Sequence, residues 1–167
     1  MINKKVEDIL VKQIEFEIFS SNLYLSMASW AEQNGFGGVA KWMLAQSQEE
    51  VDHSLKFVSY VNSRGGKAII PAIEAPQSEF KDIKELFEET LKHEQLVTSL
   101  INDIIAVTIE EKDFTTNQWM QWFVTEQIEE EENVNNILDK IKLLGDSGNY
   151  YHFDNDILGM RQPAAAV

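Results

Sequence analysis

Apolar residues recur with helical spacing along four long segments of this chain. In the first segment, Leu10, Ile14 and Ala28 share one heptad stripe, and the glycines that follow Asn34 end the pattern. We find no stretch in which apolar and polar residues alternate convincingly, as they do in a half-buried strand. The chain is therefore predicted to be all-α. The first long helix is expected over about residues 4–34 and the second from the glycines after Asn34 to about residue 64. The third and fourth are expected over about 78–111 and 115–144.

The lengths of the connections predict the topology of the bundle. Ser78 is the expected N-cap of the third helix, and Thr115 to Gln118 have capping-box spacing at the start of the fourth. Short connections after the first and third helices predict two antiparallel hairpins. The proline-marked stretch between the second and third helices has about fifteen residues, enough to span about 45–50 Å, the length of a long helix. We therefore expect one long crossover and parallel second and third helices, followed by a short fifth helix over about 149–158 and a tail over 161–167.

Composition narrows the class of protein. With 167 residues and 44% hydrophobic content, the chain is long enough for one domain over 1–167 with its own core. It has no cysteine, which excludes disulfides, thiolate metal sites and cysteine nucleophiles. Its net charge of −14 opposes binding to nucleic acid and to anionic membranes and favours cations. With neither a signal peptide nor a membrane span in the sequence, a cytoplasmic protein is expected.

Polar residues of metal-ligand type interrupt each of the four apolar stripes near the middle of its helix. Mid-helix positions lie at one level in a bundle, so packing the stripes together would gather these side chains in a single central layer. Buried carboxylates repel one another unless cations neutralise them. The alternatives are a hydrated polar layer or surface positions wrongly assigned to the stripes. The interrupting residues are Glu17 in the first helix, Glu50 and His53 in the second, Glu94 in the third, and Gln127 and Glu130 in the fourth.

The ligand types indicate which metal this layer would suit. Glu50 and His53 form a Glu-x-x-His step, so both side chains project from one helix face about a turn apart. Several carboxylates with one imidazole and no sulfur suit two divalent ions that share a carboxylate, with iron or manganese favoured over zinc. The fourth helix carries Gln127 and Glu130 in place of a second such step. The second metal position is therefore expected to have fewer strong ligands.

Together these residues resemble the bacterial non-haem ferritins, and the resemblance covers essentially the whole chain. It implies that Glu17 and His53 hold one iron ion and that Glu94 and Glu130 hold the other. Glu50 would bridge the two ions. By the same resemblance Gln127 would be a weak ligand or a neighbour of one, and Tyr24, one heptad after Glu17, would hydrogen-bond or donate an electron near the site.

The resemblance also implies a third iron position. Its ligands would be Glu49, Glu126, Glu129 and Glu130, although the acidic run 129–132 can also be read as a solvated block of charge. A haem-binding relative is not expected, because Asp52 stands where that group has its haem-ligating methionine.

The function implied by the resemblance is iron storage with ferroxidase activity. The substrates would be Fe(II) and O2 or H2O2, and Fe(III) would be deposited as a hydrated oxide inside a homo-oligomeric shell of about twenty-four subunits. One alternative is a di-iron oxidoreductase that acts on peroxide or an organic substrate, which would need an apolar pocket beside the metals. Another is a DNA-protecting miniature ferritin, but the chain lacks the basic tail that such a protein uses, and we expect no nucleic-acid or membrane partner.

Several remaining residues are expected to have structural roles. His93 lies about 100° from the stripe that holds Glu94 and is expected at the surface. His152 and the four tryptophans are expected in packing or subunit contacts. The aromatic and apolar side chains of the fifth segment exceed what a helix of about ten residues can bury alone. That segment is therefore expected to support shell assembly and to take no part in the iron chemistry.

Overall fold

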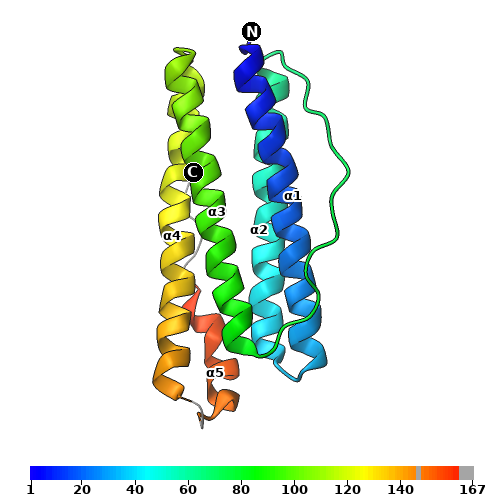
Figure 1. Cartoon of the computed structure of the whole chain (residues 1–167), viewed down its shortest axis with the longest axis vertical. Helices are drawn as coiled ribbons and strands as arrows, with labels where there is room; N and C mark the ends of the chain where they lie inside the picture. Colours follow the sequence, from blue (N-terminus) through cyan, green and yellow to red (C-terminus); the bar gives the residue numbers. More distant parts are fainter. Residues whose placement is uncertain (146–147, 162–167) are drawn as a thin grey trace.

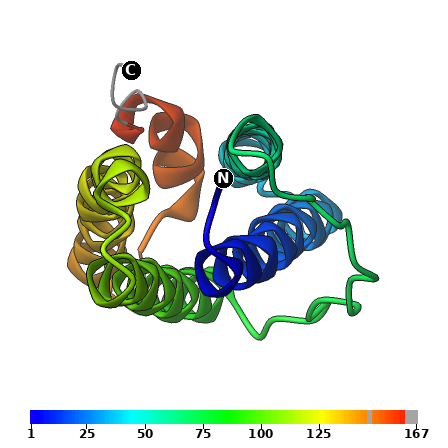
Figure 2. The same cartoon turned by 90° about the horizontal axis from the view of Figure 1, so that it is seen from above.

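The computed structural model describes residues 1–145 and 148–161, and over these residues it contains helices and no strand. The long helices lie side by side, and a short helix lies at one end of the bundle (Figures 1 and 2). Residues 162–167, most of the predicted tail, lie outside the described residues. The elements are α1 (Lys4–Gln33), α2 (Gly37–Ser63), α3 (Ile83–Glu110), α4 (Phe114–Leu144), α5 (Tyr150–Asp156) and the 3-10 turn η1 (Ile157–Met160).

The connection between α2 and α3 runs along the whole bundle on the side of α1 (Figure 1). Ser26 of α1 holds part of this crossover by donating a hydrogen bond of 2.8 Å to the main-chain oxygen of Gln77. Because the crossover returns the chain to the end where α2 began, α2 and α3 run parallel. The predicted four-helix bundle with one long crossover is confirmed.

Two helix starts differ from the prediction. The N-cap of α3 is Asp82, whose side chain accepts a hydrogen bond of 2.8 Å from the main-chain nitrogen of Glu85, so the assignment of the cap to Ser78 was wrong. The cap of α4 is Asp113, which accepts one of 3.0 Å from the nitrogen of Thr116. The capping-box spacing at 115–118 therefore begins inside α4. In both cases the side chain of an aspartate satisfies a free N–H group of the first turn.

The core consists of two hydrophobic clusters, one toward each end of the bundle. Tyr24, Trp42 and Phe87 belong to the cluster near α5, and Leu10 and Phe57 belong to the other. Between them along every long helix lie the buried polar side chains. The central polar layer is therefore bounded by apolar packing on both sides, and its side chains are held in a largely water-free interior.

The short α5 is partly a component of this core. Phe153 and Ile157 are buried in the cluster that contains Phe87, and the α5 and η1 segments lie against α2 and α4. Tyr151 remains exposed, with 72% of its surface accessible. Phe153 and Ile157 thus pack within their own chain, and for these two the expected burial in partner subunits is wrong. The role of the segment in shell assembly stays a prediction.

The tryptophans divide into two pairs. Trp30 and Trp42 are buried in the core cluster near α5, as the packing prediction required. Trp119 and Trp122 are half-buried beside Phe123 at the other end of the polar layer. Among the described helices, none is sufficiently long and apolar to cross a lipid bilayer.

Candidate metal centre

The four long helices bring the predicted ligands together in one buried layer. Each of these side chains lies on the inward face of its helix, level with the boundary between the two hydrophobic clusters. Their accessible fractions are low enough to require a counter-charge or a proton for each carboxylate. These fractions are 2% for Glu17, 3% for Glu50, 4% for His53, 0% for Glu94, 6% for Gln127 and 4% for Glu130.

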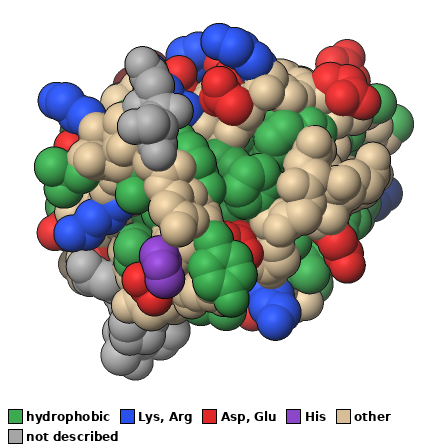
Figure 3. Space-filling model, turned by 90° about the horizontal axis from the view of Figure 1, so that it is seen from below, with side chains coloured by type: hydrophobic (Ala, Val, Ile, Leu, Met, Phe, Trp, Pro, Cys, Tyr) green, Lys and Arg blue, Asp and Glu red, His purple; other side chains and the backbone are tan. Residues whose placement is uncertain are grey.

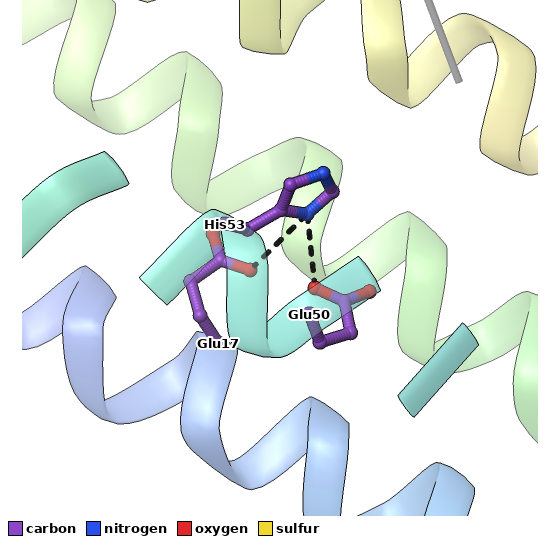
Figure 4. A group of neighbouring side chains, drawn as sticks. All are labelled: Glu17, Glu50 and His53. Carbon is purple, nitrogen blue, oxygen red and sulfur yellow. Dashed lines mark hydrogen bonds and ion pairs between the residues drawn. The ribbon is translucent and has the colours of Figure 1, made fainter. Parts of the chain in front are cut away.

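Glu17, Glu50 and His53 converge from α1 and α2 (Figure 4). Nδ1 of His53 lies 3.1 Å from Oε2 of Glu50 and 3.9 Å from Oε2 of Glu17. One ligand atom from each residue falls within 4.8 Å of the others, close enough for all three to bind one ion. The Glu-x-x-His step thus acquires its third ligand from the neighbouring helix.

On the opposite side of the layer, α3 and α4 supply Glu94, Gln127 and Glu130. The amide nitrogen of Gln127 donates a hydrogen bond of 3.2 Å to Oε2 of Glu94 and another of 3.2 Å to its main-chain oxygen. The hydroxyl of Tyr24 donates to the other oxygen of Glu94. Gln127 therefore orients a carboxylate of this layer, and the hydroxyl of Tyr24 lies directly against the candidate ligand Glu94.

Two further glutamines hold carboxylates in place and were not among the predicted site residues. Gln13 donates a hydrogen bond of 2.9 Å to Oε1 of Glu17 from one turn earlier in α1. Gln46 donates one of 2.7 Å to Oε2 of Glu130 across the α2–α4 interface. Gln46 lies on the same stripe as Glu50, and a buried amide on a ligand-bearing stripe is the signal that would have identified it.

Burial dominates the electrostatics of the layer. It raises the pKa of Glu17, Glu50 and Glu130 well above the usual value of 4.5, and it also raises that of Glu94. Repulsion from neighbouring carboxylates raises these pKa values further, as Glu94 does for Glu50. Burial and the Glu94 charge likewise raise the pKa of Tyr24, so its hydroxyl stays protonated. The layer therefore favours bound cations, either protons or metal ions.

A second acidic group adjoins the first. Ligand atoms of Glu49, His53 and Glu126 also lie within 4.8 Å of one another, and Glu126 is 1% exposed. The charges of Glu49 and Glu126 raise the pKa of Glu130, so this group is electrostatically continuous with the central layer. His53 belongs to both groups, and an imidazole has two ring nitrogens. Glu129 is half-buried and belongs to neither group.

His93 is buried, and the expectation that it lies at the surface was wrong. It is 7% exposed, and its Nε2 lies 2.7 Å from the hydroxyl oxygen of Ser20. The helix α1 covers this side of α3, and the ring packs edge-on against Tyr24. Burial lowers the pKa of His93 to about 4, so the ring is neutral near pH 7. His93 lies in neither of the two acidic groups, whereas His152 is exposed on α5.

Comparison with known proteins gives a consistent result. A family model described as a ferritin-like domain matches residues 7–144. A probable bacterial non-heme ferritin-like protein of Haemophilus influenzae is 45% identical over 148 residues, 89% of this chain and 90% of that one. A bacterial non-heme ferritin of Campylobacter jejuni is 38% identical over 149 residues, 89% of each chain.

Solved structures agree with these relatives. An open-pore ferritin from the hyperthermophilic archaeon Archaeoglobus fulgidus superposes with a TM-score of 0.91 at 38% identity, over 94% of this chain and 98% of that one. A structure described as a humanized archaeal ferritin gives a TM-score of 0.92 at 35% identity, over 99% of this chain and 100% of the other. The likeness thus extends through the crossover and the short C-terminal helix.

Proposed function

We propose, because this chain belongs to the ferritin-like domain family, that it is a cytoplasmic iron-storage subunit with ferroxidase activity. It would oxidise Fe(II) with O2 in the central layer and deposit Fe(III) as a hydrated oxide within a shell of many copies. The observation that carries the proposal is a layer of four buried carboxylates, with Glu17, Glu50 and His53 close enough to share one ion. Hard oxygen ligands with one imidazole suit iron in both oxidation states.

The residues of the layer would divide the work as follows. Glu17 and His53 hold one Fe(II), Glu94 and Glu130 hold the other, and Glu50 lies between them. The two ions supply two electrons, and one O2 with two protons becomes H2O2. Gln127 keeps the Glu94 carboxylate oriented without binding strongly itself, which suits a site that must release its product. The hydroxyl of Tyr24 donates a hydrogen bond to the same carboxylate and helps to hold it in place.

A third iron position is proposed beside the pair, with Glu49, Glu126, Glu129 and Glu130 as its candidate ligands. The spacing of Glu49, His53 and Glu126 supports a cation at this position, with His53 as an additional ligand. Hydrolysis of Fe(III) releases protons, and the surrounding carboxylates offer a path for them toward solvent. This position would therefore receive iron as it leaves the pair.

The test is O2 consumption after two equivalents of Fe(II) per subunit are added to Glu50→Ala. We expect the initial rate to fall at least about a hundredfold, because the variant loses the carboxylate common to both ions. Circular dichroism should show an intact bundle, since the change removes one of several mutually repelling carboxylates. Glu15→Ala is the matched control, because Glu15 is exposed on α1. An unchanged initial rate in Glu50→Ala would contradict the proposed site.

A further inference from the structure

We propose that Arg161 is a built-in competitor for metal at Glu49, so that iron at the third position must compete with its guanidinium for that carboxylate. The proposal rests on the function given above, since it concerns the position beside the iron pair. Neither the motifs nor the periodicity of the sequence pointed to this arginine.

The contact joins the end of the described chain to the middle of α2. One terminal nitrogen of the Arg161 guanidinium, Nη2, pairs with Oε2 of Glu49, and Nε donates a hydrogen bond of 3.0 Å to Oε1 of Gln46. The side chains of Arg161 and Glu49 are only 22% and 12% exposed. The η1 turn that precedes Arg161 is anchored by Ile157, which is fully buried. The guanidinium is thus held at Glu49 by the packing of the turn as well as by charge.

Two cations, a bound metal ion and the Arg161 guanidinium, would compete for the Glu49 carboxylate. This carboxylate belongs to the group with His53 and Glu126 that can hold an ion, and it is also the ion-pair partner of Arg161. A divalent ion at this group would lie near a fixed positive charge and would share a carboxylate already engaged in a charge-assisted hydrogen bond. Metal binding at this group must therefore either displace the guanidinium and lose the ion pair, or proceed against the repulsion between the two cations.

A second cation of the chain lies on the same face. The ammonium of Lys56 lies 3.2 Å from the centroid of the Trp122 ring, and Trp122 packs edge-on against His53. The positive charge of Lys56 interacts with the negative charges of Glu126 and Glu49. Without metal, side-chain cations therefore partly balance this acidic group, while the hydrogen bonds described for Glu17, Glu94 and Glu130 come from neutral amides and a tyrosine hydroxyl. The two positions are consequently expected to differ in metal affinity.

Arg161 also reaches the paired layer through Gln46. The guanidinium donates a hydrogen bond to the oxygen of the Gln46 amide. The amide nitrogen therefore points the other way and donates to Oε2 of Glu130 at 2.7 Å. An amide without this constraint could turn its oxygen toward the carboxylate and repel it. Arg161 is therefore a positioning residue for Glu130 and a competitor at Glu49. A third position weakened in this way would pass iron onward and not retain it.

The experiment is isothermal titration calorimetry of the metal-free protein with Zn(II), a probe that does not change oxidation state. We expect two tight equivalents and a weak third in the native chain. In Arg161→Gln, the third equivalent should bind about tenfold more tightly, because the competing charge is gone. Lys41→Gln is the matched control, since it removes one positive charge from an exposed position on α2. Its third equivalent should stay within about twofold of the native value.

Arg161→Lys separates the two roles, because it keeps the charge at Glu49 but cannot reproduce the Nε contact with Gln46. Its third equivalent should remain weak, while binding at the paired site should change through Glu130. Superimposable isotherms for the native chain and Arg161→Gln, with two tight equivalents in each, would overturn this inference and leave the proposed function intact. Absence of the two tight equivalents from the native chain would overturn both.

Discussion

In the central layer of this bundle four glutamates lie beside the imidazole of His53, and hydrogen bonds from neighbouring side chains hold most of their carboxylates. Gln13 donates to Glu17, and Gln46 donates to Glu130. Each donor satisfies an oxygen that burial has removed from water, but a neutral amide does not neutralise the charge. At the scale of single residues, the layer is therefore hydrogen-bonded while its charge is unbalanced, and metal ions or protons must complete it.

The raised pKa values predict how the metal-free protein responds to pH. Burial raises the pKa of Glu17, Glu50 and Glu130, so above pH 4.5 these carboxyls bind more protons in the folded chain than in the unfolded chain, which outweighs the opposite effect of the single buried His93. Stability must then fall as pH rises through the window between the unfolded and folded pKa values. The slope is at most about 1.4 kcal/mol per pH unit for each carboxyl. We expect a lower thermal midpoint at about pH 8 than at about pH 5.5 when no metal is present.

The general repulsion within an acidic chain acts in the same direction, so a variant must separate the two effects. Glu50→Gln removes one buried titrating group and should reduce the difference between the two thermal midpoints. Glu15→Gln removes the same formal charge from an exposed position and should reduce it less. Equal pH dependence in the native protein and both variants would show that the buried layer does not control the response.

At the scale of elements, the start of α2 depends on a distant segment. Its N-cap residue Phe36 makes no side-chain capping bond. The carboxylate of Asp154 in α5 performs this role, accepting hydrogen bonds of 3.0 Å from the nitrogen of Gly38 and 2.9 Å from that of Val39. An acidic group at a helix N-terminus also interacts favourably with the helix dipole. The short α5 is therefore coupled to the helix that carries Glu50 and His53.

Gly38→Ala tests this coupling. A Cβ at Gly38 would lie 1.7 Å from the main-chain oxygen of Asp154, so α5 would have to move and the cap would be lost. We expect destabilisation of about 1–3 kcal/mol, from the lost cap and the disturbed packing of Phe153. Gly37→Ala is the control, because a Cβ there meets nothing within 4 Å. The measurement is the unfolding midpoint of each variant. A Gly38→Ala protein as stable as Gly37→Ala would contradict the coupling between α5 and α2.

At the scale of the whole molecule, the end of the bundle that carries α5 exposes apolar surface (Figure 3). Tyr151 is 72% exposed and Leu158 is 44% exposed, whereas Phe153 and Ile157 of the same segment are buried. The segment is thus two-faced, with one face completing the core of its own chain. The other face is available for contact with further copies, as the proposed shell requires.

Exchanging only the outer face tests this role in assembly. Deleting the segment would expose the core around Phe153 and remove the cap of α2, so its effects would be mixed. We expect the double variant Tyr151→Ser and Leu158→Ser to form smaller particles by light scattering, because it removes apolar contact area. Its subunits should still consume O2 rapidly after two equivalents of Fe(II) are added. Asn155→Ser, a polar change at an exposed site, is the control, and full-size particles from the double variant would refute the assembly role.

The sequence by itself determined the features that depend on local periodicity. Heptad spacing specified the four helices, and the length of the crossover specified the parallel relation of α2 and α3. The polar residues of the candidate centre were identifiable because each lies on a stripe that must face inward. Glu17, Glu50 and Glu94 can each be recognised as candidate ligands from the pattern of a single helix, because a carboxylate on an inward-facing apolar stripe needs a counter-charge.

Only the tertiary structure decided which side chains meet across helices. His93 is buried because α1 covers a face of α3 that its own helical pattern leaves polar. Asp154 caps α2 and Arg161 pairs with Glu49 because the chain turns back after α4, a turn whose direction no periodicity encodes. Such contacts depend on distances between segments that lie from about seventy to more than one hundred residues apart, whereas helical periodicity extends only along a single element.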